Sequence, residues 1–215
     1  MMNTIIVIAL WAVPVLLAIT LHEAAHGYTA RHFGDPTAEH AGRITLNPLR
    51  HIDPVGTVAV PLGIYLASSL AGGAGMLFGW AKPVPVNFAR LRNPKADMLW
   101  VAAAGPLANL AMAIAWAGVF AVAAGGTANP LAAMAVVGMQ INGVLMFLNL
   151  LPIPPLDGGR IVVSLLPDRL ARKYARIEPY GIIIVLVLLF SRALAAVLGP
   201  LVDMFMRTLM MLGGH

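Results

Sequence analysis

The segment TLHEAAHGY (residues 20–28) places two histidines and a glutamate inside a strongly apolar stretch of the chain. His22 and His26 are four residues apart, so on a helix both rings lie on one face and can reach a single ion. Glu23 lies beside that face, where it can act as a general base without being a ligand. Ionisable side chains gathered in an apolar helix indicate a functional site. The spacing therefore predicts that His22 and His26 bind a metal ion and that Glu23 serves as the base.

A hydrolytic zinc site needs a third protein ligand, and the sequence offers two candidates. His32 extends the pattern to HEAAHGYTARH, but Thr29 stands where a glycine would be needed to turn the chain back. On a continuous helix His32 lies about 120° from the ligand face. The other candidate is Asp157 in NLLPIPPLDGGR (149–160), which could also be an ordinary loop carboxylate paired with Arg160. Because the chain has no cysteine, any metal must be held by His, Asp or Glu.

The composition is that of an integral membrane protein. Of the 215 residues, 60% are hydrophobic and 11% are charged, whereas a soluble domain is about half apolar and a quarter charged. The length suits one membrane-embedded domain over 1–215. The net charge of +5 is not gathered on a basic face interleaved with aromatic residues, so nucleic acid is not expected as a partner. The expected surroundings are a lipid bilayer.

Apolar segments long enough to cross a bilayer predict an all-α polytopic fold with about four to six membrane segments. They are 4–30, 98–124, 131–151 and 180–198, with a marginal fifth at 54–71. The tail from Pro200 is apolar but is expected to be too short to span. The polar stretches between them are 31–53, 81–97 and 152–179. Prolines 152, 154 and 155 disfavour helix, so Asp157 is expected in a turn.

Three motifs in order carry a resemblance to a known family: HEAAH at 22–26, GPLAN at 105–109 and NLLPIPPLDGGR at 149–160. Together they resemble the site-2 proteases, the intramembrane zinc metalloproteases of peptidase family M50. The chain is similar to the minimal branch, without a PDZ or CBS domain. The resemblance implies cleavage of peptide bonds in or near transmembrane segments of membrane proteins, known as regulated intramembrane proteolysis.

The resemblance also implies roles for individual residues. In the family the two HExxH histidines and the aspartate of the LDG motif bind zinc, which corresponds to His22, His26 and Asp157, with one Zn²⁺ per chain. The HExxH glutamate is the base, which corresponds to Glu23. Asn149 holds a position near the family's active site and could donate a hydrogen bond to the oxyanion, as could Asn109.

A shared metal site and the distribution of charge predict the same topology. If His22 and Asp157 meet, helices 4–30 and 131–151 run parallel, 98–124 runs antiparallel to both, and a re-entrant or irregular segment lies between the first and second. The three polar stretches then share one face and carry three, four and five Lys or Arg residues, whereas the link 125–130 carries none. The positive-inside rule places this face, and the active site, towards the cytoplasm of a bacterial inner membrane.

Two other classes of function are compatible with a polytopic membrane protein that binds a metal. A transporter predicts paired ionisable groups along several helices, but the stretch 98–151 has no ionisable side chain and offers amides such as Asn109, Gln140 and Asn142. A catalytically inactive membrane scaffold would have no use for Glu23. The sequence does not determine the oligomeric state.

Overall fold

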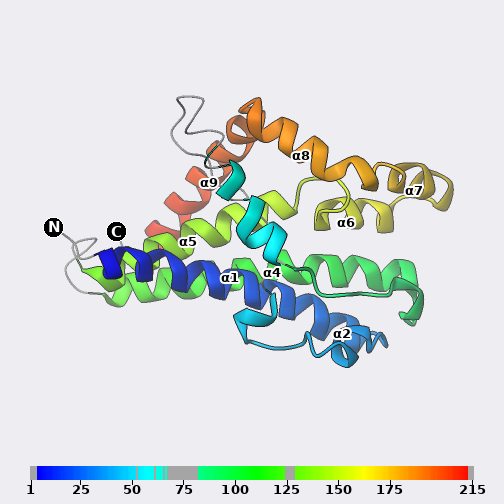
Figure 1. Cartoon of the computed structure of the whole chain (residues 1–215), viewed down its shortest axis with the longest axis horizontal. Coiled ribbons are helices and arrows are strands. Elements are labelled where there is room, and N and C mark those ends of the chain that lie inside the picture. The colour runs from blue at the N-terminus through cyan, green and yellow to red at the C-terminus, as the bar shows by residue number, and fades with distance from the viewer. Residues whose placement is uncertain are drawn as a thin grey trace.

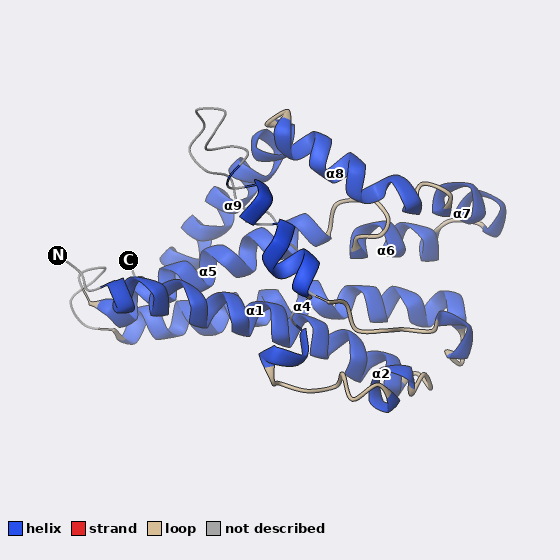
Figure 2. Ribbon diagram, viewed as in Figure 1, coloured by secondary structure: helices blue, strands red, loops and turns tan. Residues whose placement is uncertain are grey.

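The computed structural model describes residues 4–51, 53–60, 62–64, 66, 82–123 and 129–212. The α-helices in these ranges are α1 (Thr4–His32), α2 (Thr37–His40), α4 (Pro94–Val122), α5 (Pro130–Asn149), α6 (Asp157–Leu165), α7 (Asp168–Ala175), α8 (Gly181–Phe190) and α9 (Ala193–Leu212). Among these residues there is no strand, and loops join the helices (Figure 2). The predicted all-α class is confirmed.

Four helices are long and apolar enough to cross a membrane, which confirms the prediction of a polytopic membrane protein. They are Leu10–His32 of α1, Pro94–Val122, Pro130–Asn149 and Ala193–Leu212. Helices α1 and α5 run in the same direction and α4 runs in the opposite direction, as a shared metal site requires (Figure 1). The apolar core joins α4, α5 and α9 through Ala113, Ala135, Met139 and Leu209.

The segments 31–40, 88–97 and 152–179 lie in the right half of Figure 1, and the chain from 41 to 51 runs back alongside α1 towards the middle of the bundle. The end of α4 and the start of α5 lie at the opposite end, on the left, together with the start of α1 and the end of α9. The arrangement therefore agrees with the predicted topology. It also gathers the polar segments around the end of α1 that carries His22 and His26.

Local sequence determines where the core helices begin. Pro94 and Pro130 each occupy the first turn, where the missing N–H costs no hydrogen bond. At the start of α4, the carboxylate of Asp97 accepts a hydrogen bond from the backbone N–H of Asn93 at 2.7 Å. At the start of α5, the side chain of Asn129 accepts one from Leu131 at 2.9 Å. These contacts satisfy backbone donors that the helix itself leaves free.

Three local predictions differ from the structure. The predicted span 180–198 is two helices, because the chain bends between α8 and α9 at Arg192, whose φ is +61°. The tail that was predicted to be too short is the second half of α9, which continues through Pro200. Asp157 is the first residue of α6 and is not in a turn, because the prolines end at residue 155 and leave the following residues free to form helix.

The segment between α1 and α4 is described only in part. Asp53 caps a π-helical turn at Pro54–Ala59 by accepting hydrogen bonds from the N–H groups of Val55 and Gly56. Residues 60, 62–64 and 66 are helical. The rest of the predicted re-entrant or irregular segment, up to residue 81, lies outside the described residues.

Candidate metal centre

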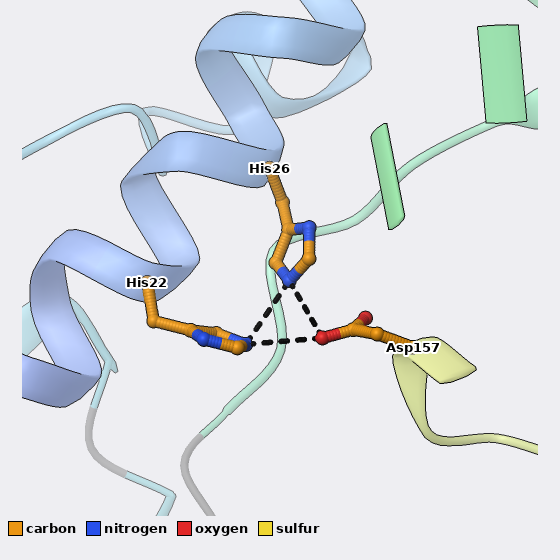
Figure 3. A group of neighbouring side chains, drawn as sticks. All are labelled: His22, His26 and Asp157. Atoms are coloured by element: carbon orange, nitrogen blue, oxygen red, sulfur yellow. Dashed lines mark hydrogen bonds and ion pairs between the residues drawn. The ribbon is translucent and has the colours of Figure 1, made fainter. Parts of the chain in front are cut away.

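His22, His26 and Asp157 meet where the inner part of α1 faces the start of α6 (Figure 3). The two Nε2 atoms are 3.1 Å apart. Oδ2 of Asp157 lies 3.3 Å from Nε2 of His22 and 3.4 Å from Nε2 of His26. Zinc bonds of about 2.0–2.1 Å in a tetrahedron separate neighbouring ligand atoms by about 3.3 Å. The triangle of ligand atoms therefore has the size of one face of a zinc coordination tetrahedron.

The tautomer of His26 follows from its backbone contact. Its Nδ1 lies 2.7 Å from the carbonyl oxygen of Val101 on α4. A carbonyl oxygen can only accept, so Nδ1 carries the proton. The neutral ring then directs the lone pair of Nε2 towards Asp157.

A chain of buried amides determines the tautomer of His22 in the same way. The side-chain nitrogen of Asn142 donates to the carbonyl of Gly138 at 2.8 Å, so its oxygen faces Asn109 and accepts from the Asn109 amide at 2.9 Å. The oxygen of Asn109 therefore faces Nδ1 of His22, which must donate to it. Nε2 of His22 is left with a lone pair.

In the neutral tautomers that these contacts favour, three lone pairs converge on one point. Oδ2 of Asp157 is buried and has no hydrogen-bond donor among the described residues. Buried acceptors that face one another without a donor are costly, unless a cation lies between them. The donor set of two imidazoles and one carboxylate suits zinc.

Two glycines make room for this arrangement. A Cβ atom on Gly105 of α4 would lie 2.4 Å from Nε2 of His26 and 2.6 Å from Nε2 of His22. A Cβ atom on Gly158 would lie 2.2 Å from the carbonyl oxygen of Leu150. Glycine at 105 lets α4 pack against both imidazoles, and glycine at 158 lets the start of α6 approach the end of α5.

Glu23 lies beside the metal centre on the wall of a cavity of about 350 Å³. Its Oε2 accepts a hydrogen bond of 2.7 Å from the backbone N–H of Val84. The extended segment 82–87 that carries Val84 is held in place by two other side chains. Arg43 donates to the carbonyl of Lys82 at 2.7 Å, and Asp35 accepts from the N–H of Asn87 at 2.6 Å. The carboxylate of Glu23 is thereby oriented by a fixed backbone donor.

The remaining predicted residues lie in different places. Asn149 lines the cavity, and its amide nitrogen donates to Leu145 of the same helix at 3.0 Å. Asn109 is fully buried behind His22, and its amide nitrogen is directed at Asn142 and Ala18. His32 is exposed and packs edge-on against Phe33. His32 is not one of the three residues whose ligand atoms converge among the described residues.

Sequence reasoning missed two residues that orient the site. Asn142 was noted only as one of the few polar residues in an apolar stretch, although a lone asparagine at mid-span was the available signal. The backbone N–H of Val84 had no sequence signal, because every residue except proline has one. Both contacts depend on packing between distant segments.

The fold is that of a polytopic membrane protein, and His22, His26 and Asp157 form a candidate metal centre in it. The model of peptidase family M50 matches residues 116–192. "Putative zinc metalloprotease YwhC" of Bacillus subtilis is 36% identical over 198 residues, covering 89% of this chain and 84% of that protein. "Putative zinc metalloprotease Rip2" of Mycolicibacterium smegmatis is 32% identical over 194 residues, covering 88% and 68%. No solved structure gives a significant match.

At these identities and coverages the chain belongs to peptidase family M50. The family and the names of its relatives define it as an intramembrane zinc protease, with zinc as its metal. The transporter and scaffold alternatives are not favoured.

Proposed function

We propose that this chain is a zinc endopeptidase that cleaves membrane-protein substrates in or near their transmembrane segments, with His22, His26 and Asp157 as the zinc ligands. The observation that carries the proposal is the convergence of the three ligand atoms, while Nδ1 of each imidazole donates to an acceptor elsewhere. Residues 1–215 would act as one membrane-embedded catalytic domain.

Glu23 is the proposed general base. Bound zinc would lower the pKa of a water molecule to about 7 and polarise the scissile carbonyl. Glu23 would take the proton of this water and pass it to the leaving amine. The Val84 N–H occupies Oε2 and leaves Oε1 for this transfer, so the hydrogen bond fixes the direction of the carboxylate.

The two asparagines have different proposed roles. Asn149 lines the cavity together with Glu23 and Asp157, and rotation of its amide away from Leu145 would let it donate to a developing oxyanion. Asn109 is directed away from the cavity. Its supported role is to accept the Nδ1 proton of His22, in place of the oxyanion contact that its motif suggested. Such outer-shell acceptors orient metal-binding imidazoles.

The proposed orientation places the metal centre towards the cytoplasm of a bacterial inner membrane. The support is the excess of Lys and Arg in the three polar segments 31–53, 81–97 and 152–179, which carry three, four and five such residues, over the link 125–130, which carries none. Since the chain has no cysteine, single cysteines at positions 90 and 128 can report the orientation by labelling with an impermeant reagent. We expect labelling from outside at 128 only. Labelling from outside at 90 and not at 128 would show that the true orientation is the reverse of the proposed one.

The test of the function is to compare the zinc content and turnover of detergent-purified wild type and Glu23→Gln. The amide retains the size of the glutamate, so zinc should remain bound while cleavage falls by about 10²–10⁴, the usual contribution of a general base. The substrates would be single-span membrane proteins with helix-breaking residues near the cytoplasmic end. Equal cleavage by both proteins would refute the role of Glu23.

The ligand set has its own test in the same preparation. His22→Ala and His26→Ala should each abolish zinc binding, and Asp157→Asn should weaken it less, because an amide oxygen still coordinates poorly. His32→Ala is the matched control on the same helix and should retain full zinc. Full occupancy in both histidine variants, or loss of zinc in the His32 variant, would refute the ligand assignment.

A further inference from the structure

Helix α9 carries two charged side chains on its outer face. Asp203 and Arg207 are one helical turn apart and both are exposed. They are the eleventh and fifteenth of the 20 residues of α9, which is one of the four helices able to span a membrane. Charged side chains within a span are costly in contact with lipid and indicate an interaction.

The packing of α9 places this pair within the membrane. Phe205, between the two charges in sequence, stacks edge-on against Phe147 of α5, with ring centroids 5.7 Å apart. A Cβ atom on Gly143 of α5 would lie 2.9 Å from the Phe205 ring. Helix α5 is itself a membrane span that ends at Asn149. Asp203 and Arg207 flank the residue that packs against its second half, so both lie within the depth of that span.

In the other spanning helices, charged side chains lie in the first or last turn or face the cavity. In α1, Glu23 faces the cavity and Arg31 is in the last turn. In α4, the charged residues Lys95 and Asp97 are in the first turn, and α5 has none. Asp203 and Arg207 have no ion pair or hydrogen bond from their side chains to any residue in the described part of the chain. In this conformation the two charges are left for each other, one turn away, or for a partner outside these residues.

We propose that this face of α9 is an interface with a second copy of the same chain. The exposed residues Val197, Pro200, Met204, Arg207 and Met211 recur at alternating spacings of three and four, which is the heptad spacing of packed helices. Five of the six residues that line an open groove on this face extend from Asp203 to Met211. The stripe is continuous along the outer side of the helix.

Charge complementarity favours a second copy as the partner. Two copies in one membrane have the same orientation, so their α9 helices meet in parallel about a two-fold axis. About such an axis each residue is level with its own copy, and the long side chain of Arg207 can reach back one turn, about 6 Å, to Asp203 of the other copy. The two reciprocal pairs would neutralise all four charges in the span. The assignment is independent of the proteolytic function.

The test is disulfide crosslinking of single cysteines in native membranes. Met204→Cys on the proposed interface should crosslink on oxidation to a species of twice the 22.6 kDa chain mass. The matched control is Ile114→Cys on α4, which is similarly exposed at 53%, compared with 62% for Met204, and should stay monomeric. Because Met204→Cys changes no charge, its result stands whether or not the charge variants fold. Absence of the dimer, or a crosslink only to a different protein, would overturn the proposal.

Charge exchange then tests the pairing in the Met204→Cys background. Asp203→Arg alone and Arg207→Asp alone should each abolish the crosslink, because four like charges would meet, and the double exchange should restore it. Zinc content reports that each variant is folded. A crosslink unaffected by the single changes, or not restored by the double exchange in a zinc-loaded protein, would overturn the ionic pairing. Retained turnover with no crosslink would refute the dimer and leave the protease assignment standing.

Discussion

Two sets of polar side chains lie within the membrane spans, and they differ in where their partners are. His22, Asn109 and Asn142 form a buried chain in which each donor meets an acceptor of the same molecule. Asp203 and Arg207 lie on the outer face of α9 and have no such partner among the described residues. Polar groups in a bilayer need partners, so the first set indicates a site within the chain and the second indicates contact between chains.

The comparison predicts that a change in the interior acts on the metal. Gly105→Ala should have the largest effect, because the added methyl group would lie within 2.6 Å of both Nε2 atoms. We expect zinc affinity to fall by more than about 10²-fold, beyond the 10–100-fold that is typical of losing an outer-shell partner. Affinity can be measured by competition with a chromophoric chelator.

Gly118→Ala is the matched control for Gly105→Ala. It lies on the same helix, and nothing is within 4 Å of an added Cβ atom. Alanine should stabilise both positions as helix, so a fall in affinity at 105 alone isolates the steric effect. Equal zinc affinity in the two variants would show that α4 can move away from the imidazoles.

Loss of the acceptor behind Asn109 should have the next largest effect. Asn142→Ala frees the Asn109 amide to rotate and present its nitrogen to His22. This rotated amide no longer favours the His22 tautomer with a lone pair on Nε2. Zinc affinity should fall about 10–100-fold. Met139→Ala, at an equally buried position one turn away on α5, should lower thermal stability and leave zinc affinity unchanged. A similar fall in zinc affinity in both variants would show that Asn142 acts only through packing.

These residues also show what sequence could and could not predict. The spans of α4 and α5 follow from hydropathy, although the predicted starts at 98 and 131 miss the prolines at 94 and 130 that begin the helices. The ligand spacing of His22 and His26 follows from the helical repeat. The residues that hydrogen-bond to those ligands cannot be predicted in this way. Asn109 and Asn142 are 33 residues apart and meet only after α4 packs on α5. The contact between Glu23 and Val84 is longer in range still.

Two of the differences in local structure concern the region of α8 and α9. The break between the two helices occurs at Arg192, without a proline or glycine to mark it, and α9 continues through Pro200, so that the tail is part of a helix long enough to span. In a membrane helix, neighbouring helices and local adjustment tolerate a proline that would cost about 3 kcal/mol in a soluble helix. Position within the fold therefore outweighs the local signal at Pro200.

Removing the backbone donor to Glu23 should have a smaller effect, on turnover rather than on zinc. Val84→Pro deletes the N–H that orients the carboxylate and replaces the valine side chain, in an extended segment where both neighbours are already proline. We expect kcat to fall about tenfold, which corresponds to the roughly 1.5–3 kcal/mol of a hydrogen bond to a charged group, partly offset by water. Zinc content should change little, and KM should change only as much as it does when the valine side chain alone is shortened.

Val84→Ala separates the hydrogen bond from the side chain. It retains the N–H and removes the valine methyl groups that line the cavity. The Ala variant should keep kcat and alter KM, because the cavity wall changes while the base stays oriented. If the Pro and Ala variants lose kcat equally, the Val84 amide does not orient Glu23.

The smallest expected effect tests whether the two polar regions are independent. The double variant Asp203→Asn, Arg207→Gln retains side-chain size on α9 and removes both charges, so it should weaken the crosslink through Met204→Cys. Zinc affinity should stay within about twofold of wild type, because distant sites without shared partners add within roughly 0.3–0.5 kcal/mol. The apolar cluster of α4, α5 and α9 carries no polar path from the charged face to His22 among the described residues. A larger fall in zinc affinity would mean that contact between copies acts on the metal centre, and the separation between an interior site and an outer interface would no longer hold.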